Sequence, residues 1–135
     1  MCGIVGRYNL NQEEVKKENV ENMLKTIVHR GPDHGDLWIK DKIGLGHRLL
    51  KIQDLSKKSF QPYKYKNLVM VYNGEIYNYK ELRKKLKKEN IEFNTIGDIE
   101  VLIKCFEHWG IEETLKKLKG VIQLHCISRM KIHYI

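Results

Sequence analysis

The sequence has few cysteines and no long apolar run, and both shortages exclude classes of protein. Its three cysteines, Cys2, Cys105 and Cys126, are an odd number and lack the spacing of metal ligands, so we expect neither a disulfide framework nor a metal centre. Free thiols suit a reducing compartment, which favours the cytoplasm. No apolar run approaches the length that crosses a bilayer, and charged residues appear soon after Val5, where a signal peptide needs an apolar core. We therefore expect a soluble protein with no membrane partner.

No linker, repeat or low-complexity tract divides the 135 residues, so the length indicates one domain. The net charge of +8 raises nucleic acid as a partner. The lysines, however, concentrate in helix-like stretches such as 80–89, where Leu82 and Leu86 lie four residues apart. No aromatic platform accompanies this charge, so a solvated helix face is the favoured interpretation and nucleic acid is not expected. A small basic binding module stays as the non-catalytic alternative, and a salt-dependent shift on polynucleotide would reveal it.

Hydrophobic periodicity predicts a mixture of helices and strands. Apolar residues at helical spacing predict a helix over 20–28, which stops at the loop signal 29–32. Strands are predicted at 37–39, 43–50 and 68–72, and further helices at 79–88, 98–109 and 111–118. Asn73–Gly74 follows the third strand and is a favourable turn dipeptide. Strands with helices among them indicate a layered α+β fold.

Cys2 follows the initiator methionine directly. Removal of Met1 would leave a residue that carries both a thiol and a free α-amine. An α-amino group has a pKa of about 7.7–8.0, so a good share of it is unprotonated near neutral pH and can act as the base for the thiol. An isolated cysteine at a frayed terminus is usually inert, but Gly3 and Gly6 flank an apolar strand and polar clusters follow. Cys105 lies on the apolar side of its helix, so we expect it in the core.

Five ordered motifs carry a resemblance to a known family. They are MCGIVG at 1–6, HRGPD at 29–33, GLGHRLLKIQDLS at 44–56, NGEIYN at 73–78 and GDIEV at 97–101. Over residues 2–120 the chain resembles the glutaminase domain of class II glutamine amidotransferases, and most of all the domain found in glutamine-hydrolysing asparagine synthetases. A glutaminase domain of the aminosugar or purine branch is the enzymatic alternative.

The resemblance implies a fold and a reaction. The fold would be the four-layer αββα sandwich of N-terminal-nucleophile hydrolases. The reaction would be hydrolysis of glutamine to glutamate and ammonia, with Cys2 as nucleophile and with Asn73 and Gly74 holding the oxyanion. No cofactor or metal is implied for this step, because ATP and Mg²⁺ belong to the synthetase domain of the longer relatives. The parent enzyme is expected to be a homo-oligomer.

The resemblance also implies residues that hold the two charged ends of glutamine. Glu75 and Asp98 would lie near the α-ammonium, although Asp98 could also be only the N-cap of its helix. Backbone groups of Ile52 and Gln53 would line the same pocket. Arg30 would support the loop over the N-terminus, because a guanidinium can bridge several carbonyl groups. His29 and His47 are expected to be structural, since an N-terminal nucleophile needs no imidazole.

Two positions depart from the family pattern. Leu49 stands where the family usually has an arginine that pairs with the glutamine carboxylate, and such a bidentate contact is strong. Arg48 is expected to face the opposite side of the strand and cannot replace it. Gly97 stands where serine is commoner, which is a milder change.

The last segment, 121–135, is a further departure. Here the family continues with a buried strand, several more strands and the synthetase domain, whereas this sequence loses the pattern. A reading frame shifted near residue 122 can encode a segment that resembles the family strand. We therefore expect an aberrant, frameshifted tail on a C-terminally incomplete domain. Such a domain would fold poorly and have little or no activity. An inactive remnant of such a domain is the matching functional alternative.

Overall fold

The computed structural model describes the whole chain except residues 1, 12, 51–59, 129–131 and 135. Its strands are β1 (Gly3–Tyr8), β2 (His34–Lys40), β3 (Ile43–Leu49), β4 (Tyr63–Tyr65), β5 (Leu68–Ile76), β6 (Gly120–Ser128) and β7 (Ile132–Tyr134). Its helices are α1 (Lys17–Thr26), α2 (Tyr79–Lys88), α3 (Asp98–Trp109) and α4 (Ile111–Lys117), with a 3₁₀ turn, η1, at Val28–Arg30. Among the described residues no helix is long and apolar enough to cross a membrane.

Sheet A contains β1, β3 and β2 in that order, and both strand pairs are antiparallel. Helix α1 covers its outer face. A Cβ at Gly44 would collide with Val20 of α1, and a Cβ at Gly46 would meet Leu24. The glycines therefore let the helix lie close against the middle strand.

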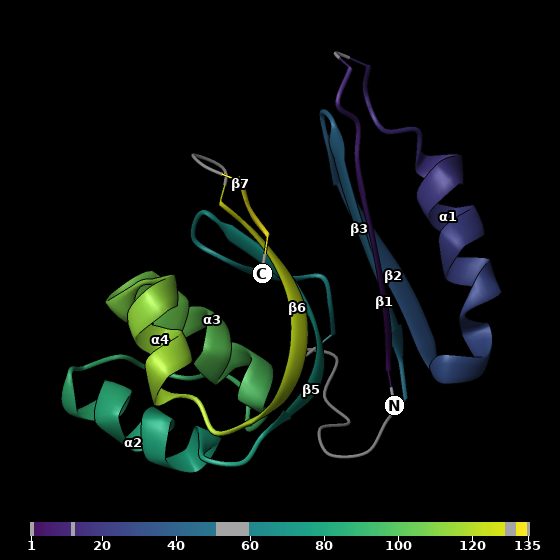
Figure 1. The fold of residues 1–135 in the computed structure, drawn as a ribbon. Coiled ribbons are helices and arrows are strands. Elements are labelled where there is room, and N and C mark those ends of the chain that lie inside the picture. The colour runs from purple at the N-terminus through teal and green to yellow at the C-terminus, as the bar shows by residue number, and fades with distance from the viewer. Residues whose placement is uncertain (1, 12, 51–59, 129–131, 135) are drawn as a thin grey trace.

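Sheet B contains β4, β5, β6 and β7, again antiparallel throughout. Helix α3 packs on its outer face, and α2 and α4 flank α3 (Figure 1). Buried side chains from α3 such as Leu102 and Phe106 meet Met70 of β5 and Leu124 of β6 in the largest apolar cluster. This cluster explains the helical periodicity of 98–109, because the buried residues fall on the face that meets the sheet.

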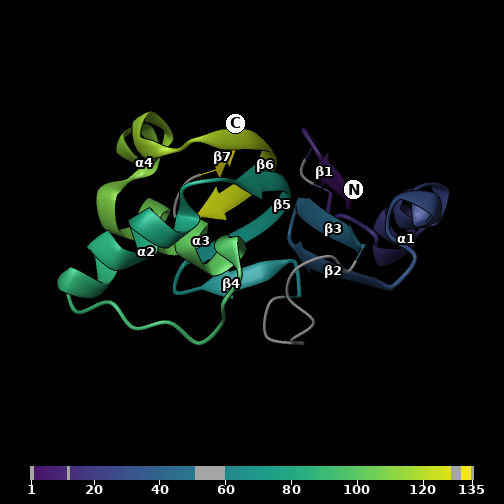
Figure 2. The same ribbon diagram turned by 90° about the horizontal axis from the view of Figure 1, so that it is seen from below.

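The two sheets face each other across a smaller apolar layer. Ile43 and Leu45 of β3 meet Val69 and Val71 of β5 and Ile127 of β6. Figures 1 and 2 show the resulting order of layers, which is α1, sheet A, sheet B and then α2–α4. The four-layer αββα arrangement implied by the family resemblance is therefore confirmed.

The strand predicted at 68–72 is longer than expected, and the turn prediction at Asn73–Gly74 is wrong. Strand β5 continues through this pair to Ile76. Its partner is β6, in which Ile122 lies opposite Gly74 and Gly120 opposite Ile76. Pairing with a segment almost fifty residues away thus overrides the local turn propensity.

The segment predicted as an aberrant tail contributes β6. Val121–Ser128 of this segment and the preceding Gly120 pair with the whole of β5, and Leu124, Cys126 and Ile127 are buried. The structure therefore places a sheet strand where the family pattern is lost. The frameshift hypothesis concerns the coding sequence and stays a prediction.

Candidate active site

Cys2 lies immediately before β1, an edge strand of sheet A. Its thiol Sγ is 3.4 Å from the Leu50 amide nitrogen, which donates to it, and 3.7 Å from the Leu50 carbonyl oxygen. Arg30 Nε donates to the Cys2 carbonyl oxygen at 3.3 Å. The thiol is half-buried, so Cys2 is held by two neighbouring segments and still partly exposed.

Asn73 and Gly74 lie on β5 of the opposite sheet. Asn73 is half-buried and Gly74 is exposed. A Cβ at Gly74 would collide with the Val121 carbonyl oxygen and lie 2.8 Å from the Ile122 Cα, and the Gly74 φ of +155° is unfavourable for other residues. Close approach of β6 to β5 therefore requires glycine next to Asn73.

Asp98 is the first residue of α3, and its carboxylate turns toward β5. Oδ2 accepts a hydrogen bond from the Tyr72 hydroxyl at 2.8 Å and another from the Ile76 amide at 3.3 Å. The N-cap position belongs to Gly97, and no side chain caps α3. The N-cap interpretation of Asp98 is therefore wrong: its carboxylate joins the helix to the strand that carries Asn73 and Gly74.

The pKa of the Tyr72 hydroxyl depends on its burial and on the charged groups around it. Burial raises the pKa of its hydroxyl well above the usual value, and the negative charges of Asp98, Glu75 and Cys2 raise it further. The phenol is therefore neutral over the whole physiological pH range and acts as a hydrogen-bond donor. Strands β1 and β5 contact each other across the sheet interface. Glu75 itself is exposed on β5.

Leu49 and Arg48 face opposite sides of β3. The Arg48 guanidinium lies against Gly35, and Arg48 lines a groove of about 590 Å³ with residues of α1 such as Lys25. Side chains alternate along a strand, so Leu49 shares the face of His47 and Leu45, which points at sheet B. Arg48 is thus directed away from the space between the sheets.

A buried network fixes the segment 92–97, which leads into Asp98. Glu100 accepts hydrogen bonds from the Asn94 and Thr95 amides at 2.7–3.1 Å, and Lys104 Nζ donates to it at 2.7 Å. Arg83 of α2 donates to the carbonyl oxygens of Thr95 and, at 2.7 Å, of Gly97. Sequence analysis missed this network, although the spacing of Glu100 and Lys104 on the helix is a signal for an ion pair.

Cys105, Cys126 and His47 are buried, whereas Cys2 is half-buried. Burial raises the pKa of both Cys105 and Cys126 to about 12, so these thiols stay protonated. Burial and the neighbouring His34 lower the pKa of His47 to about 4. His47 is therefore neutral at physiological pH, as a structural imidazole would be. Ile52 and Gln53 lie outside the described residues.

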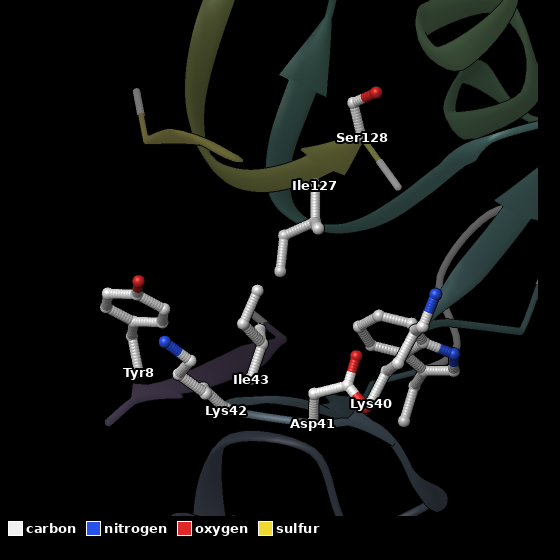
Figure 3. Close-up of a pocket in the computed structure, with 8 residues that line it drawn as sticks. Tyr8, Lys40, Asp41, Lys42, Ile43, Ile127 and Ser128 are labelled. Atoms are coloured by element: carbon white, nitrogen blue, oxygen red, sulfur yellow. The ribbon is translucent and has the colours of Figure 1, made fainter. Parts of the chain in front are cut away.

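A second concavity lies at the other end of the sheet interface. It has a volume of about 230 Å³ and is lined by Tyr8, Lys40, Lys42, Ile43 and Ile127, among others. Figure 3 shows Ile127 of β6 pointing toward Ile43 of β3, with the lysines at the rim. No group of three or more potential metal ligands occurs in the part of the chain that the structure describes. Cys2, Glu75 and Asp98 do not line this concavity.

Comparison with known proteins identifies the family of this chain. The family model of the glutamine amidotransferase domain matches residues 1–135. A glutamine-hydrolyzing asparagine synthetase 1 of Bacillus subtilis is 40% identical over 126 residues, which cover 90% of this chain and 20% of the relative. An asparagine synthetase 1 of Arabidopsis thaliana is 35% identical over 115 residues, which cover 83% of this chain and 19% of the relative. The chain thus spans about a fifth of the length of these relatives.

A solved structure supports the fold independently. The glutamine phosphoribosylpyrophosphate amidotransferase of B. subtilis superimposes with a TM-score of 0.76 at 17% identity and covers 95% of this chain and 35% of its own. The shared architecture is the N-terminal-nucleophile hydrolase sandwich. With the family model matching over its whole length, this chain belongs to the class II glutamine amidotransferase family.

Proposed function

We propose that this domain hydrolyses the side-chain amide of glutamine and supplies ammonia to an asparagine synthetase-like enzyme. One observation carries the proposal: β1, which the half-buried Cys2 precedes, contacts β5, the strand that bears Asn73 and Gly74, and the Asp98 carboxylate accepts a hydrogen bond from Tyr72 of the same strand. The proposed nucleophile, oxyanion donors and ammonium-binding carboxylate are the groups that hydrolysis of a carboxamide needs.

Chemistry would begin with removal of Met1. The freed α-amine takes the proton of the Cys2 thiol, and the thiolate adds to the amide carbon of glutamine. The Asn73 side-chain amide and the Gly74 N–H donate to the resulting oxyanion. Collapse of this intermediate transfers the proton to the leaving nitrogen and releases ammonia. Water then hydrolyses the thioester, which gives glutamate and restores the thiol.

Asp98 would bind the substrate ammonium, with Glu75 adding negative charge nearby. We assign no cofactor to this step. ATP and Mg²⁺ would be used by a separate synthetase domain, the parent enzyme would be a homo-oligomer, and the three free thiols fit a cytoplasmic location.

The test is selective modification of Cys2 followed by an assay. Mass spectrometry should show Met1 absent and a chloroketone analogue of glutamine attached at Cys2, while Cys105 and Cys126 stay unmodified. Cys2→Ser should abolish the release of glutamate and ammonia from glutamine, whereas the matched variant Cys105→Ala should retain it. Labelling spread evenly over the three thiols would contradict the proposal.

A further inference from the structure

The Tyr72 hydroxyl donates a hydrogen bond to a residue of another layer. It is buried on β5, with 4% of its surface exposed, and its hydroxyl reaches across to the Asp98 carboxylate at the start of α3. The next two residues of β5 are Asn73 and Gly74. One short stretch of strand therefore contacts Asp98 and also carries the proposed oxyanion donors.

Both donors to Asp98 use the same carboxylate oxygen. The Tyr72 hydroxyl and the Ile76 amide converge on Oδ2, and no other described residue donates to Oδ1. A carboxylate torsion is broad and nearly two-fold, so one weak donor would leave the group free to rotate. Two donors on Oδ2 fix the plane of the carboxylate and leave Oδ1 available to a cation.

The backbone of Asp98 is fixed separately. Arg83 and Glu100 hold the segment before α3 by hydrogen bonds to its carbonyls and amides. Removal of the Tyr72 hydroxyl should therefore leave Asp98 in place and change only the orientation of its carboxylate. Because Tyr72 stays a neutral donor, this restraint persists over the physiological pH range.

We propose that Tyr72 is a positioning residue that holds the Asp98 carboxylate at a set distance from Asn73 and Gly74, so that Oδ1 receives the α-ammonium while the amide carbon reaches Cys2. The inference rests on the proposed glutaminase function. In this proposal Tyr72 makes the site prefer substrates that carry an α-ammonium group, and it takes no part in bond cleavage.

The experiment uses two chloroketones on the full chain: the analogue of glutamine, and the same compound without its α-amino group. Modification rates at Cys2 are measured by mass spectrometry. The unmodified sequence should react faster with the amino compound, and Tyr72→Phe should lower that preference roughly tenfold, because it removes a hydrogen bond to a charged group. The ratio of two rates on one sample cancels any difference in the folded fraction.

Tyr65→Phe is the matched control. Tyr65 lies on β4 of the same sheet, and the substitution keeps the ring that lies 5.0 Å from Lys104 Nζ, so the preference for the amino compound should be unchanged. Asp98→Asn should remove the preference, and Tyr72→Phe should add nothing in that background, because the two residues act as one unit.

The outcomes separate the two proposals. If neither chloroketone modifies Cys2, the proposed function fails and this inference falls with it. If Cys2 reacts but the amino compound has no advantage, or if Tyr72→Phe retains the full advantage, the nucleophile stands and the role of Tyr72 is overturned.

Discussion

The sheet A half of the molecule, sheet A with α1, differs from the sheet B half, sheet B with α2–α4, in how it is stabilised. In the sheet A half, four buried side chains, Val5, Val15, Val20 and Leu24, pack beneath a single helix. The sheet B half has a cluster of thirteen buried residues under α3 and a buried ion pair between Glu100 and Lys104. Cys2, the proposed nucleophile, lies on the sheet A half, which has the smaller core. Glu75 and Asp98, the proposed substrate anchors, lie on the sheet B half.

This difference assigns separate tasks to the two halves. Cys2 is held by hydrogen bonds to backbone groups of Leu50 and through Arg30, at the end of an edge strand. Asp98 is held by side chains from α2, α3 and β5. We infer that the sheet B half sets the positions of the charged groups, while the reactive thiol stays accessible on the sheet A half.

The largest expected effect comes from breaking the buried ion pair. Lys104→Met leaves the Glu100 carboxylate buried without its cation, which should lower the free energy of unfolding by about 3–5 kcal/mol. Chemical denaturation measures this loss. The double variant Glu100→Gln/Lys104→Met should recover part of it, and no recovery would show that the two side chains contribute independently.

The same ion pair predicts that the free energy of unfolding decreases at acidic pH. Burial opposes the charged form of Glu100, but hydrogen bonds from Lys104, Asn94 and Thr95 lower its pKa below the usual value. Glu100 therefore stabilises the fold above the unfolded pKa of about 4.3 and loses this contribution as the pH falls through the lower folded pKa. Denaturation curves between pH 6 and 3 should show the loss in the natural sequence and a shallower fall in Glu100→Gln.

Core truncation compares the two halves directly. Leu102 of α3 is fully buried against sheet B, and Leu24 of α1 is 7% exposed against sheet A. We expect Leu102→Ala to cost about 3 kcal/mol and Leu24→Ala about 2 kcal/mol, since a thin layer relaxes more easily around a cavity. Equal losses in urea denaturation would argue against a difference in packing depth.

Leu49→Arg tests the carboxylate end of the site. Leu49 is on the face of β3 that points at sheet B, because side chains alternate along a strand and Leu45 packs against sheet B. An arginine here should improve apparent glutamine affinity by about 1.5–3 kcal/mol through a charge-assisted hydrogen bond, measured as a lower KM. Leu49→Met is the matched control, and an unchanged KM for the arginine variant would contradict the alignment of this strand with the family.

The smallest effect is expected at an exposed ion pair of the sheet A half. Lys17 Nζ lies 3.3 Å from Glu21 Oε1 on α1. Glu21→Gln should change stability by no more than about 0.5 kcal/mol, the range of exposed helical pairs, and less in high salt. A thermal melt at two salt concentrations measures it, and a loss comparable to that of Lys104→Met would show that burial is not the deciding factor.

Local pattern was sufficient to predict the helices and most strands. The helix predicted over 98–109 coincides with α3, and the one over 79–88 with α2. These predictions succeed because the apolar positions repeat at the helical period and the buried faces follow them. The ordered motifs likewise indicated the family, which the match over 1–135 confirms.

Long-range contacts decided the features that local pattern predicted incorrectly or missed. Asn73–Gly74 carries a turn signal, but nine residues of β6 pair with β5 and keep the pair in a strand. The N-cap was the alternative interpretation of Asp98, but its carboxylate accepts a hydrogen bond from Tyr72 of the sheet. Lys104, on which the sequence made no prediction, is 5% exposed and lies close to the Tyr65 and Phe93 rings.

The sequence by itself therefore determined the helices, the strands β1, β2, β3 and β5, the nucleophile motif and the family. The tertiary structure decided which polar groups converge: Tyr72, Asp98 and Cys2 are far apart in the chain, and only the packing of α3 on sheet B and of sheet B on sheet A brings them together. Hydrogen bonds between such groups depend on distance and orientation in space, and the periodicity of one segment carries no information about either.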